Sequence, residues 1–263
     1  LSGRKMGKVL LPAPINQHLR SRSPDLKNAR VFLQSLPGGN GALGARKPQP
    51  RAEGPDFVGV GVQKCGTTWI GEIVNQHPDA FVQKKEISFF TRYFQKGYGW
   101  YHRFFANKNG RLAGEISVNY MYSPRPDSTH KEFYPHWNPR RALYFWRRMP
   151  AARDELKAHY PDLKVFSMFR NPADRAWSHY WMWRNRKERM GKKTVPFEKM
   201  FREDGRWMRL QGNYADLLAY WREAFPDMGV FFHDDLVKDP GALARKVFCF
   251  LGLDASFEPE TRK

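Results

Sequence analysis

The chain has few cysteines and no long hydrophobic run. Only Cys65 and Cys249 occur among its 263 residues, which excludes a disulfide framework and a zinc site built from cysteines. No stretch of 18 or more apolar residues is present, so the sequence predicts no transmembrane helix. Because the chain begins at Leu1 rather than at Met, we expect a location in the Golgi lumen if an upstream anchor has been removed, and a cytoplasmic location otherwise.

Acidic residues are also scarce relative to basic ones. The 45 Lys and Arg residues outnumber the 26 Asp and Glu residues, and the formal net charge is +19. Such a charge predicts a polyanionic partner, which leaves nucleic acid, an anionic membrane, an anionic glycan and a multiply charged nucleotide open. The hydrophobic content of 41% is sufficient for the core of one α/β domain.

Residues 1–55 differ in composition from the rest of the chain. They hold ten Lys or Arg residues against two acidic ones, together with seven Pro and seven Gly. A segment with so little apolar material cannot form a core. We therefore predict a basic arm or linker over residues 1–55 and one catalytic domain over residues 56–263.

From Phe57 onward, short apolar runs alternate with helical patterns. This alternation indicates βαβ units and hence an α/β fold with a P-loop-like central parallel sheet flanked by helices. The predicted strands cover residues 57–62, 80–83, 112–118, 164–169 and 229–233. The predicted helices cover residues 68–77, 151–159, 173–189, 213–225 and 240–251.

The first functional signal is the sequence FVGVGVQKCGTTW at Phe57–Trp69. A strand that opens through glycines into a helix directs backbone N–H groups and the positive helix end at an anion. In a Walker A register, however, Thr67 occupies the lysine position, and the nearest lysine is Lys64. The loop therefore suits a nucleotide with one phosphate group in the cradle and no metal ion.

The second signal is FRNPADRAWSHYWMW, which follows the predicted strand at 164–169. Arg170 ends that strand, Asn171 is a suitable N-cap, and Pro172 suits the first helical position. Ser178 lies about two helical turns further on. Since open α/β sheets bind ligands at the carboxyl ends of their strands, Arg170 and Ser178 are candidates for holding a phosphate monoester.

With both segments in hand, the chain resembles the sulfotransferases that use 3′-phosphoadenosine 5′-phosphosulfate (PAPS). QKCGTTW resembles their 5′-phosphosulfate loop, and the spacing from Arg170 to Ser178 matches their 3′-phosphate motif. KKEISFF, GYGWYHRFF and GEISVNYMYSP are similar to segments of heparan sulfate and related carbohydrate sulfotransferases. The resemblance extends from about residue 57 to residue 253.

The resemblance implies a role for each matching residue. Glu86 would be the general base, and Lys64, with Lys85, would stabilise charge on the leaving phosphate. The donor would be PAPS, the product 3′,5′-adenosine bisphosphate, and no metal would be needed. The residues implied to bind the nucleotide are Lys64, Cys65, Gly66, Thr67, Thr68, Trp69, Arg170, Ser178 and Tyr214.

Two positions depart from the family pattern. Ile116 stands where the heparan enzymes usually have a lysine, so one charge that would contact the acceptor or the transition state is missing. Cys65 replaces the usual small Ser or Gly of the phosphate loop. The acceptor therefore stays open between a hydroxyl and an amine, and between a carbohydrate, such as an anionic glycan, and a small molecule.

Several alternatives stay open at this point. His102 is a rival general base, because cytosolic sulfotransferases use histidine, or else a packed neutral ring. Basic residues interleave with aromatic ones, which suits an anionic sugar chain, a planar small molecule, or a helix core with a solvated face. The same clusters leave a nucleic-acid-binding module as an alternative, although we expect no specific nucleic acid, and His233–Asp235 leaves a small-molecule kinase. The basic clusters comprise Arg140, Arg141, Arg147, Arg148, Arg184, Arg186, Lys187 and Arg189.

Overall fold

Five parallel strands form the centre of the described chain. The computed structural model describes residues 51, 53–83, 86–123, 150–203 and 205–260. The sheet has the order β2-β3-β1-β4-β5, with every neighbouring pair parallel. The predicted α/β fold is thereby confirmed. The strands are β1 (Phe57–Gly61), β2 (Ala80–Val82), β3 (Leu112–Ile116), β4 (Lys164–Phe169) and β5 (Gly229–Phe232).

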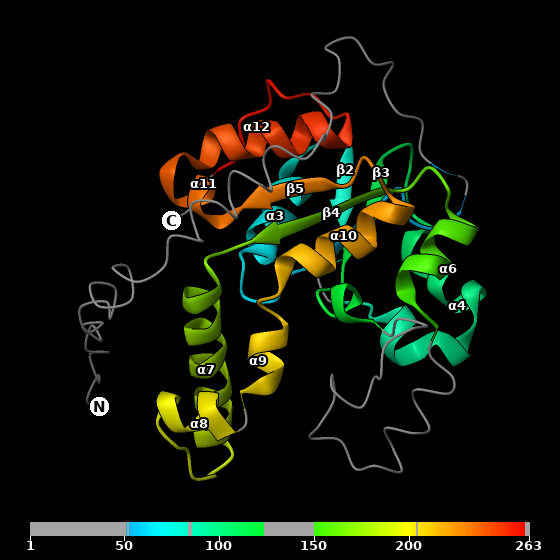
Figure 1. Cartoon of the computed structure of the whole chain (residues 1–263). Helices are drawn as coiled ribbons and strands as arrows, with labels where there is room; N and C mark the ends of the chain where they lie inside the picture. The colour runs from blue at the N-terminus through cyan, green and yellow to red at the C-terminus, as the bar shows by residue number, and fades with distance from the viewer. Residues whose placement is uncertain (1–50, 52, 84–85, 124–149, 204, 261–263) are drawn as a thin grey trace, which may run out of the picture. The chain divides into compact units, whose positions relative to one another are not determined.

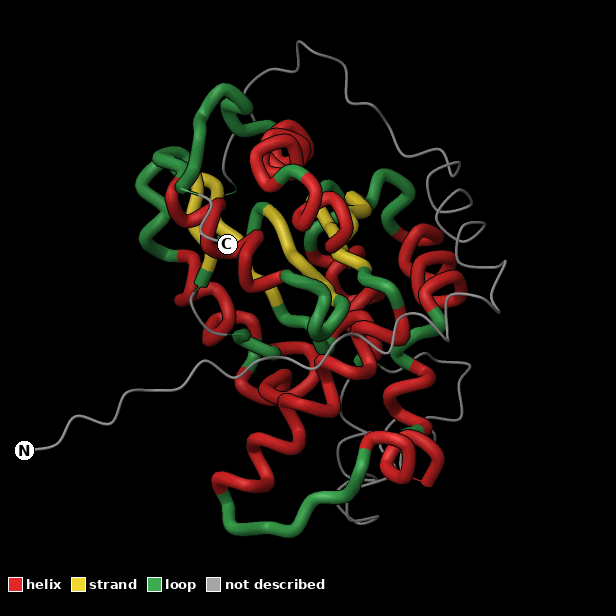
Figure 2. Tube along the Cα trace, turned by 90° about the vertical axis from the view of Figure 1, so that its left-hand side faces the viewer, coloured by secondary structure: helices red, strands yellow, loops and turns green. Residues whose placement is uncertain are grey.

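Helices surround this sheet (Figures 1 and 2). Figure 1 shows α3 behind β4 and α10 in front of it, while α7 leaves the carboxyl end of β4 and points away from the sheet. In the described part of the chain, no helix is both long enough and apolar enough to cross a membrane. The α-helices are α3 (Thr67–Gln76), α4 (Tyr98–His102), α6 (Ala152–His159), α7 (Pro172–Arg189), α8 (Phe197–Glu203), α9 (Arg206–Leu210), α10 (Tyr214–Ala224), α11 (His233–Lys238) and α12 (Pro240–Leu251).

Local sequence signals account for most of these boundaries. All five residues of β1 are buried, as expected for an apolar central strand covered on both faces. Asp239 caps α12 by accepting a hydrogen bond from the Ala242 N–H at 2.9 Å, and Gly252 ends that helix with a φ of 76°. Predicted strand 229–233 is one residue too long, because His233 already begins α11.

Periodicity did not predict the segment between β2 and β3, nor did it predict the short helices α8, α9 and α11. The segment between β2 and β3 forms a π-helical turn, η1 (Phe89–Tyr93), two 3₁₀ turns, η2 (Phe94–Lys96) and η3 (Arg103–Phe105), and the short helix α4. Aromatic packing holds it together, and the Phe89 and Tyr101 rings stack with centroids 4.6 Å apart. Such contacts follow the tertiary fold rather than a repeat in the sequence.

Because all five strands run in the same direction, their carboxyl ends share one edge of the sheet. β1 leads there into the predicted phosphate loop, β4 into Arg170, and β5 into His233. The strand order thus brings together three segments that are far apart in sequence. Residues 1–50 lie outside the described residues, so the boundary at residue 55 stays a prediction.

Candidate active site

The loop after β1 has the backbone of an anion-binding turn. Lys64 and Gly66 both have left-handed conformations, with φ values of 70° and 99°, and such conformations turn successive N–H groups toward one point. A Cβ atom on Gly66 would lie 3.1 Å from Met168 Cε and 3.3 Å from His233 Cδ2. Glycine is therefore required at position 66 by both conformation and space.

Hydrogen bonds with β4 fix the backbone where β1 leads into this loop. The Val62 N–H donates to the Met168 carbonyl at 3.0 Å, and Ser167 Oγ donates to the Gly61 carbonyl at 2.8 Å. After Gly66, α3 begins with Thr67, which is buried, and Thr68, which is exposed. The N–H groups in the first turn of a helix have no intrahelical acceptor, so they are available to an anion.

Cys65 lies inside the loop but faces the protein interior. Its side chain is completely buried, and its Sγ lies 4.0 Å from the Tyr214 hydroxyl. Burial raises the pKa of the Cys65 thiol to about 12, although Arg175, Tyr214 and Arg170 act in the opposite direction. The thiol is therefore protonated at neutral pH, and Cys65 and Tyr214 form the packed floor of the loop.

Arg170 lies beside Cys65. Its backbone N–H bonds to Cys65, and its buried Nε has no hydrogen-bond acceptor within the described residues. The prediction of a capped helix after Arg170 is confirmed, because Asn171 Oδ1 accepts from the Ala173 N–H at 2.9 Å and Pro172 is the first residue of α7.

The helix that carries Ser178 lies within electrostatic range of Lys64. Ser178 is half-buried on α7. Burial and the positive charge of Lys64 lower the pKa of the next residue, His179. Burial is the main reason that the pKa of His179 falls to about 4, with Arg175 and Lys64 adding to the effect. A neutral His179 thus lies next to Ser178 on α7, where the charges of Arg175 and Lys64 affect it.

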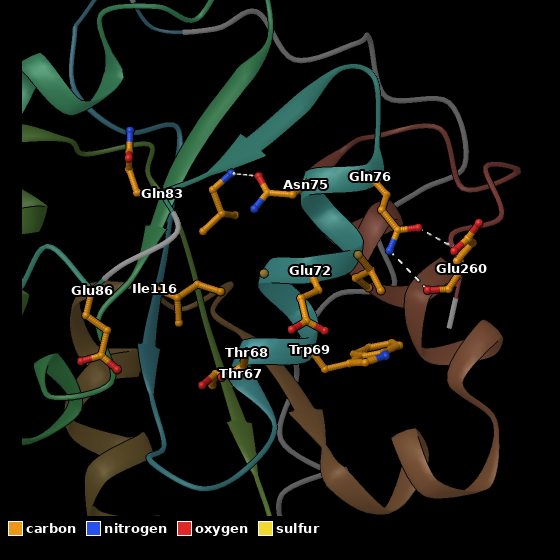
Figure 3. A pocket seen from close by; sticks show the side chains of 13 residues that line it. Thr67, Thr68, Trp69, Glu72, Asn75, Gln76, Gln83, Glu86, Ile116 and Glu260 are labelled. Atoms are coloured by element: carbon orange, nitrogen blue, oxygen red, sulfur yellow. Dashed lines mark hydrogen bonds between the residues drawn. The ribbon is translucent and has the colours of Figure 1, made fainter. Parts of the chain in front are cut away.

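Glu86 lies on the wall of a pocket of about 560 Å³ that begins at the phosphate loop (Figure 3). Thr67, Thr68 and Ile116 share that wall, so the predicted base and the start of α3 face the same space. Glu86 is exposed, yet partial loss of water around its carboxylate raises its pKa, and nearby Arg92 opposes the shift. The remaining lining residues are Trp69, Gly71, Glu72, Ile73, Asn75, Gln76, Val82, Gln83 and Glu260.

His102 does not lie at this pocket. Its Nδ1 bonds to Glu53 Oε2 at 3.0 Å, and its Nε2 bonds to the Tyr160 hydroxyl at 2.8 Å. Glu53 precedes β1, so His102 is near the amino end of that strand, whereas the loop follows the carboxyl end. The structure therefore gives no support to His102 as an alternative base.

The aromatic side chains of α7 form part of a packed cluster, which is one of the alternatives that the sequence left open. Trp177, Trp181 and Trp183 pack against a buried cluster that includes Tyr180. Cations cover the outer faces of two of these rings: the Arg184 guanidinium lies 5.0 Å from the Trp181 ring, and Lys187 Nζ lies 5.4 Å from the Trp183 ring. The cluster at Arg140, Arg141, Arg147 and Arg148 lies outside the described residues, as do Lys84 and Lys85.

Comparison with known proteins agrees with this geometry. The family model for the sulfotransferase domain matches residues 54–263. The chain belongs to the sulfotransferase family. The matched range includes the loop at Lys64, the predicted base Glu86, and Arg170 with its helix. Within the described residues of this sulfotransferase domain, no group of three or more His, Cys, Asp or Glu side chains is placed to hold a metal ion.

Related proteins support the same assignment. Mouse heparan sulfate glucosamine 3-O-sulfotransferase 3A1 is 30% identical over 243 residues, which are 84% of this chain and 54% of that protein. The mouse 3B1 enzyme is 30% identical over 210 residues, 76% of this chain and 46% of that protein. The chain thus spans about half the length of these curated relatives. A sulfotransferase from Alicyclobacillus acidocaldarius superposes with a TM-score of 0.60 at 25% identity, covering 80% of this chain and 85% of its own.

The sulfotransferase domain also brings residues to the loop that sequence reasoning missed. Arg175 is fully buried, donates to Gln211 Oε1 at 2.8 Å and to the Met208 carbonyl, and keeps an Nε without an acceptor in the described chain. His233 faces Gly66 although 167 positions separate them, because β4 places β5 close to β1. A charged residue on the inner face of the helix after Arg170 is the sequence feature that could have identified Arg175.

Proposed function

We propose that the protein is a sulfotransferase that transfers the sulfuryl group of PAPS to a hydroxyl or amine. The observation that supports this function best is the meeting of three features at one edge of the sheet: the loop at Lys64, the strand end at Arg170, and Glu86 on the pocket wall. These features supply an anion cradle, a guanidinium and a carboxylate, which are the groups that the reaction requires.

The residues around the loop fit a nucleotide that carries phosphate groups at two positions. Arg170 and Arg175 each have a buried Nε without an acceptor in the described chain, so an anion would satisfy donors that are otherwise costly to bury. Lys64, Gly66, Thr67 and Thr68 would hold the 5′ end of PAPS. Arg170 and Ser178 would hold its 3′-phosphate, with Trp69 and Tyr214 nearby. When bound, PAPS supplies the sulfuryl group.

Groups of the protein would then accept the proton of the acceptor and stabilise the negative charge of the leaving phosphate. Glu86 would accept the proton of the attacking hydroxyl or amine, because it faces the same pocket as the start of α3. The Lys64 ammonium and the first N–H groups of α3 would stabilise negative charge at the 5′-phosphate. The pocket would admit the acceptor from the side of Ile116.

We infer that the acceptor is a carbohydrate, because the relatives named above act on heparan sulfate glucosamine. The distal half of α7 would attract an anionic chain through its Arg and Lys side chains. A Golgi lumenal location would suit such an acceptor, and fractionation of cells that express the full-length protein would test it. An acceptor screen would compare heparan sulfate, free glucosamine and p-nitrophenol, each with PAPS.

Titration calorimetry with 3′,5′-adenosine bisphosphate tests the proposal before any acceptor is known. We expect metal-independent binding that is much tighter than that of ADP or of ATP with Mg²⁺. Arg170→Ala should weaken binding of the bisphosphate more than that of ADP, because only the former has a 3′-phosphate. Preference for ATP with Mg²⁺ would contradict the proposal and favour a kinase, whereas salt-sensitive binding of a DNA duplex alone would favour a nucleic-acid-binding module.

A further inference from the structure

Three consecutive backbone N–H groups immediately after Glu86 are bound by buried side chains. The Ile87 N–H donates to the Glu115 carboxylate, the Ser88 N–H donates to Ser117 Oγ at 3.0 Å, and the Phe89 N–H donates to the Tyr120 hydroxyl at 2.8 Å. This segment lies between β2 and the turn η1, so no sheet ladder provides these bonds. The path of the chain after Glu86 therefore depends on side chains from the region of β3.

Glu115 connects the side chains of Ser117, Tyr120 and Tyr101 into one cluster. It is completely buried, and its Oε1 accepts from the Tyr101 hydroxyl at 2.6 Å and from the Tyr120 hydroxyl at 2.8 Å. Its Oε2 accepts from Ser117 Oγ at 2.6 Å. Every hydroxyl hydrogen in the cluster is used on Glu115, so the hydroxyl oxygens of Ser117 and Tyr120 are free to accept the backbone N–H groups.

The cluster is also fixed to the strand that leads into the phosphate loop. Glu115 pairs with Val58 of β1 in the parallel register, and the Ser117 N–H donates to the Gly59 carbonyl at 2.9 Å. Two residues beyond Gly59, β1 ends and the loop begins. The cluster thus links the segment that carries Glu86 to the strand that carries the phosphate loop.

The backbone at Ser88 shows why such a link is needed. Ser88 has a left-handed conformation with a φ of 53°, which is unfavourable for a residue with a side chain. Asn119 Nδ2 donates to Ser88 Oγ at 3.2 Å and adds to the bond at the Ser88 N–H. Without these bonds the chain would relax toward ordinary dihedral angles, and Glu86, two residues earlier, would move.

We propose that Glu115, Ser117 and Tyr120 are positioning residues that hold Glu86 at a fixed place relative to the phosphate loop. This inference rests on the proposed role of Glu86 as general base. None of the three side chains needs to touch the acceptor. Each acts through the peptide groups of residues 87–89, so loss of one should impair turnover more than nucleotide binding.

Tyr120→Phe and Tyr101→Phe form a matched pair for testing this proposal. Both phenols are fully buried, and both donate to the same oxygen of Glu115. Only the Tyr120 hydroxyl accepts a backbone N–H of the segment after Glu86. We expect faster deuterium exchange at the amides of residues 87–89 in Tyr120→Phe than in Tyr101→Phe.

Kinetics provides the second measurement, with release of 3′,5′-adenosine bisphosphate from PAPS followed with heparan sulfate as acceptor and with water alone. Tyr120→Phe should lower kcat about ten- to a hundredfold more than Tyr101→Phe, since small displacements of a reacting group have effects of that order. The Kd of the bisphosphate should be unchanged. The acid limb of the kcat profile should move to lower pH in Tyr120→Phe alone, because a displaced Glu86 regains water.

A double-mutant cycle distinguishes failure of the positioning role from failure of the proposed role of Glu86 as general base. If Tyr120 acts through Glu86, Tyr120→Phe should have no further effect on kcat in a Glu86→Gln background. Wild-type turnover of Glu86→Gln would overturn the proposed base itself. An inactive Glu86→Gln together with equal kcat and equal amide exchange in the two Tyr→Phe variants would overturn only the positioning role. Ser117→Ala repeats the test with a smaller change if Tyr120→Phe does not fold.

Discussion

Glu86 is exposed to solvent and still has a raised pKa. The shift arises because protein atoms replace part of the water that would stabilise its negative charge, and Arg92 only partly compensates. A carboxylate with a raised pKa is a stronger base than an ordinary one, provided that the pH stays above that pKa. The environment of this residue therefore favours proton abstraction at neutral pH.

Replacing Glu86 by Gln should remove the proposed base while preserving the pocket. We expect kcat to fall by about 10²- to 10⁴-fold, with the Kd of 3′,5′-adenosine bisphosphate unchanged. In the wild type, kcat should fall as the pH drops below the raised pKa, because protonated Glu86 cannot accept a proton; this limb should vanish in the variant. Steady-state kinetics between pH 4 and 8 would measure both effects.

Glu72→Gln is the matched control for this variant. Glu72 lines the same pocket and is exposed like Glu86, but it lies on α3 rather than on the loop after β2. Its replacement removes the same charge and should leave the acid limb in place. If both variants lost turnover equally, the total charge of the pocket would be responsible rather than a single base.

At the level of secondary structure, the start of α7 is the element on which the predicted 3′-phosphate site depends. Asn171 accepts from the N–H groups of Ala173 and Asp174 at 2.9 and 3.4 Å, and Arg170 is the residue immediately before it. By contrast, Asn213 occupies the N-cap position of α10 without a side-chain cap bond. Asn171 thus caps its helix through its side chain and Asn213 does not, although both occupy an N-cap position.

Asn171→Ala should lower the free energy of unfolding by about 1 kcal/mol, the usual effect of losing an N-cap. It should also weaken binding of 3′,5′-adenosine bisphosphate, because Arg170 would lose its fixed direction. Asn213→Ala should change stability less and binding not at all. Urea unfolding and calorimetry would measure these quantities, and equal losses of stability in both variants would contradict the capping role.

At the level of the whole molecule, the charge is unevenly distributed along the chain. Residues 1–55 carry ten of the 45 basic residues but only two of the 26 acidic ones. We propose that residues 1–50 of this segment are an arm that attracts an anionic acceptor without taking part in the fold of the domain, whereas Glu53 bonds to His102 of the domain. The remaining charge belongs to the domain, including the distal part of α7.

Deletion of residues 1–50 should leave the Tm and the Kd of 3′,5′-adenosine bisphosphate unchanged. The shortened protein should elute from a heparin matrix at lower salt, because fewer cations contact the polyanion. A full-length variant with the nine Lys and Arg residues of this segment changed to Ser serves as control and should elute like the deletion. A large fall in Tm would instead show that the segment packs on the domain.

Local patterns were sufficient for much of this protein. The strands, most helices, the turn at Gly66, the cap at Asn171 and the family all followed from short stretches of sequence. They did so because alternation of apolar residues, a glycine before a helix and an asparagine before a proline act on adjacent residues. Of the residues at the candidate site, the sequence named Lys64, Glu86 and Arg170, whose roles stay predictions, but it did not name Arg175.

Contacts between distant segments were decided only by the tertiary structure. The sequence by itself determined the βαβ units, the turn at Gly66 and the arginine after β4. The strand order brought His233 to that turn, and the tertiary fold placed His102 near the opposite end of β1. Burial of Glu115 against the backbone after Glu86 likewise required β3 to lie beside β1. Such contacts join residues tens of positions apart, and no short-range pattern encodes them, because their energy exists only once the sheet has formed.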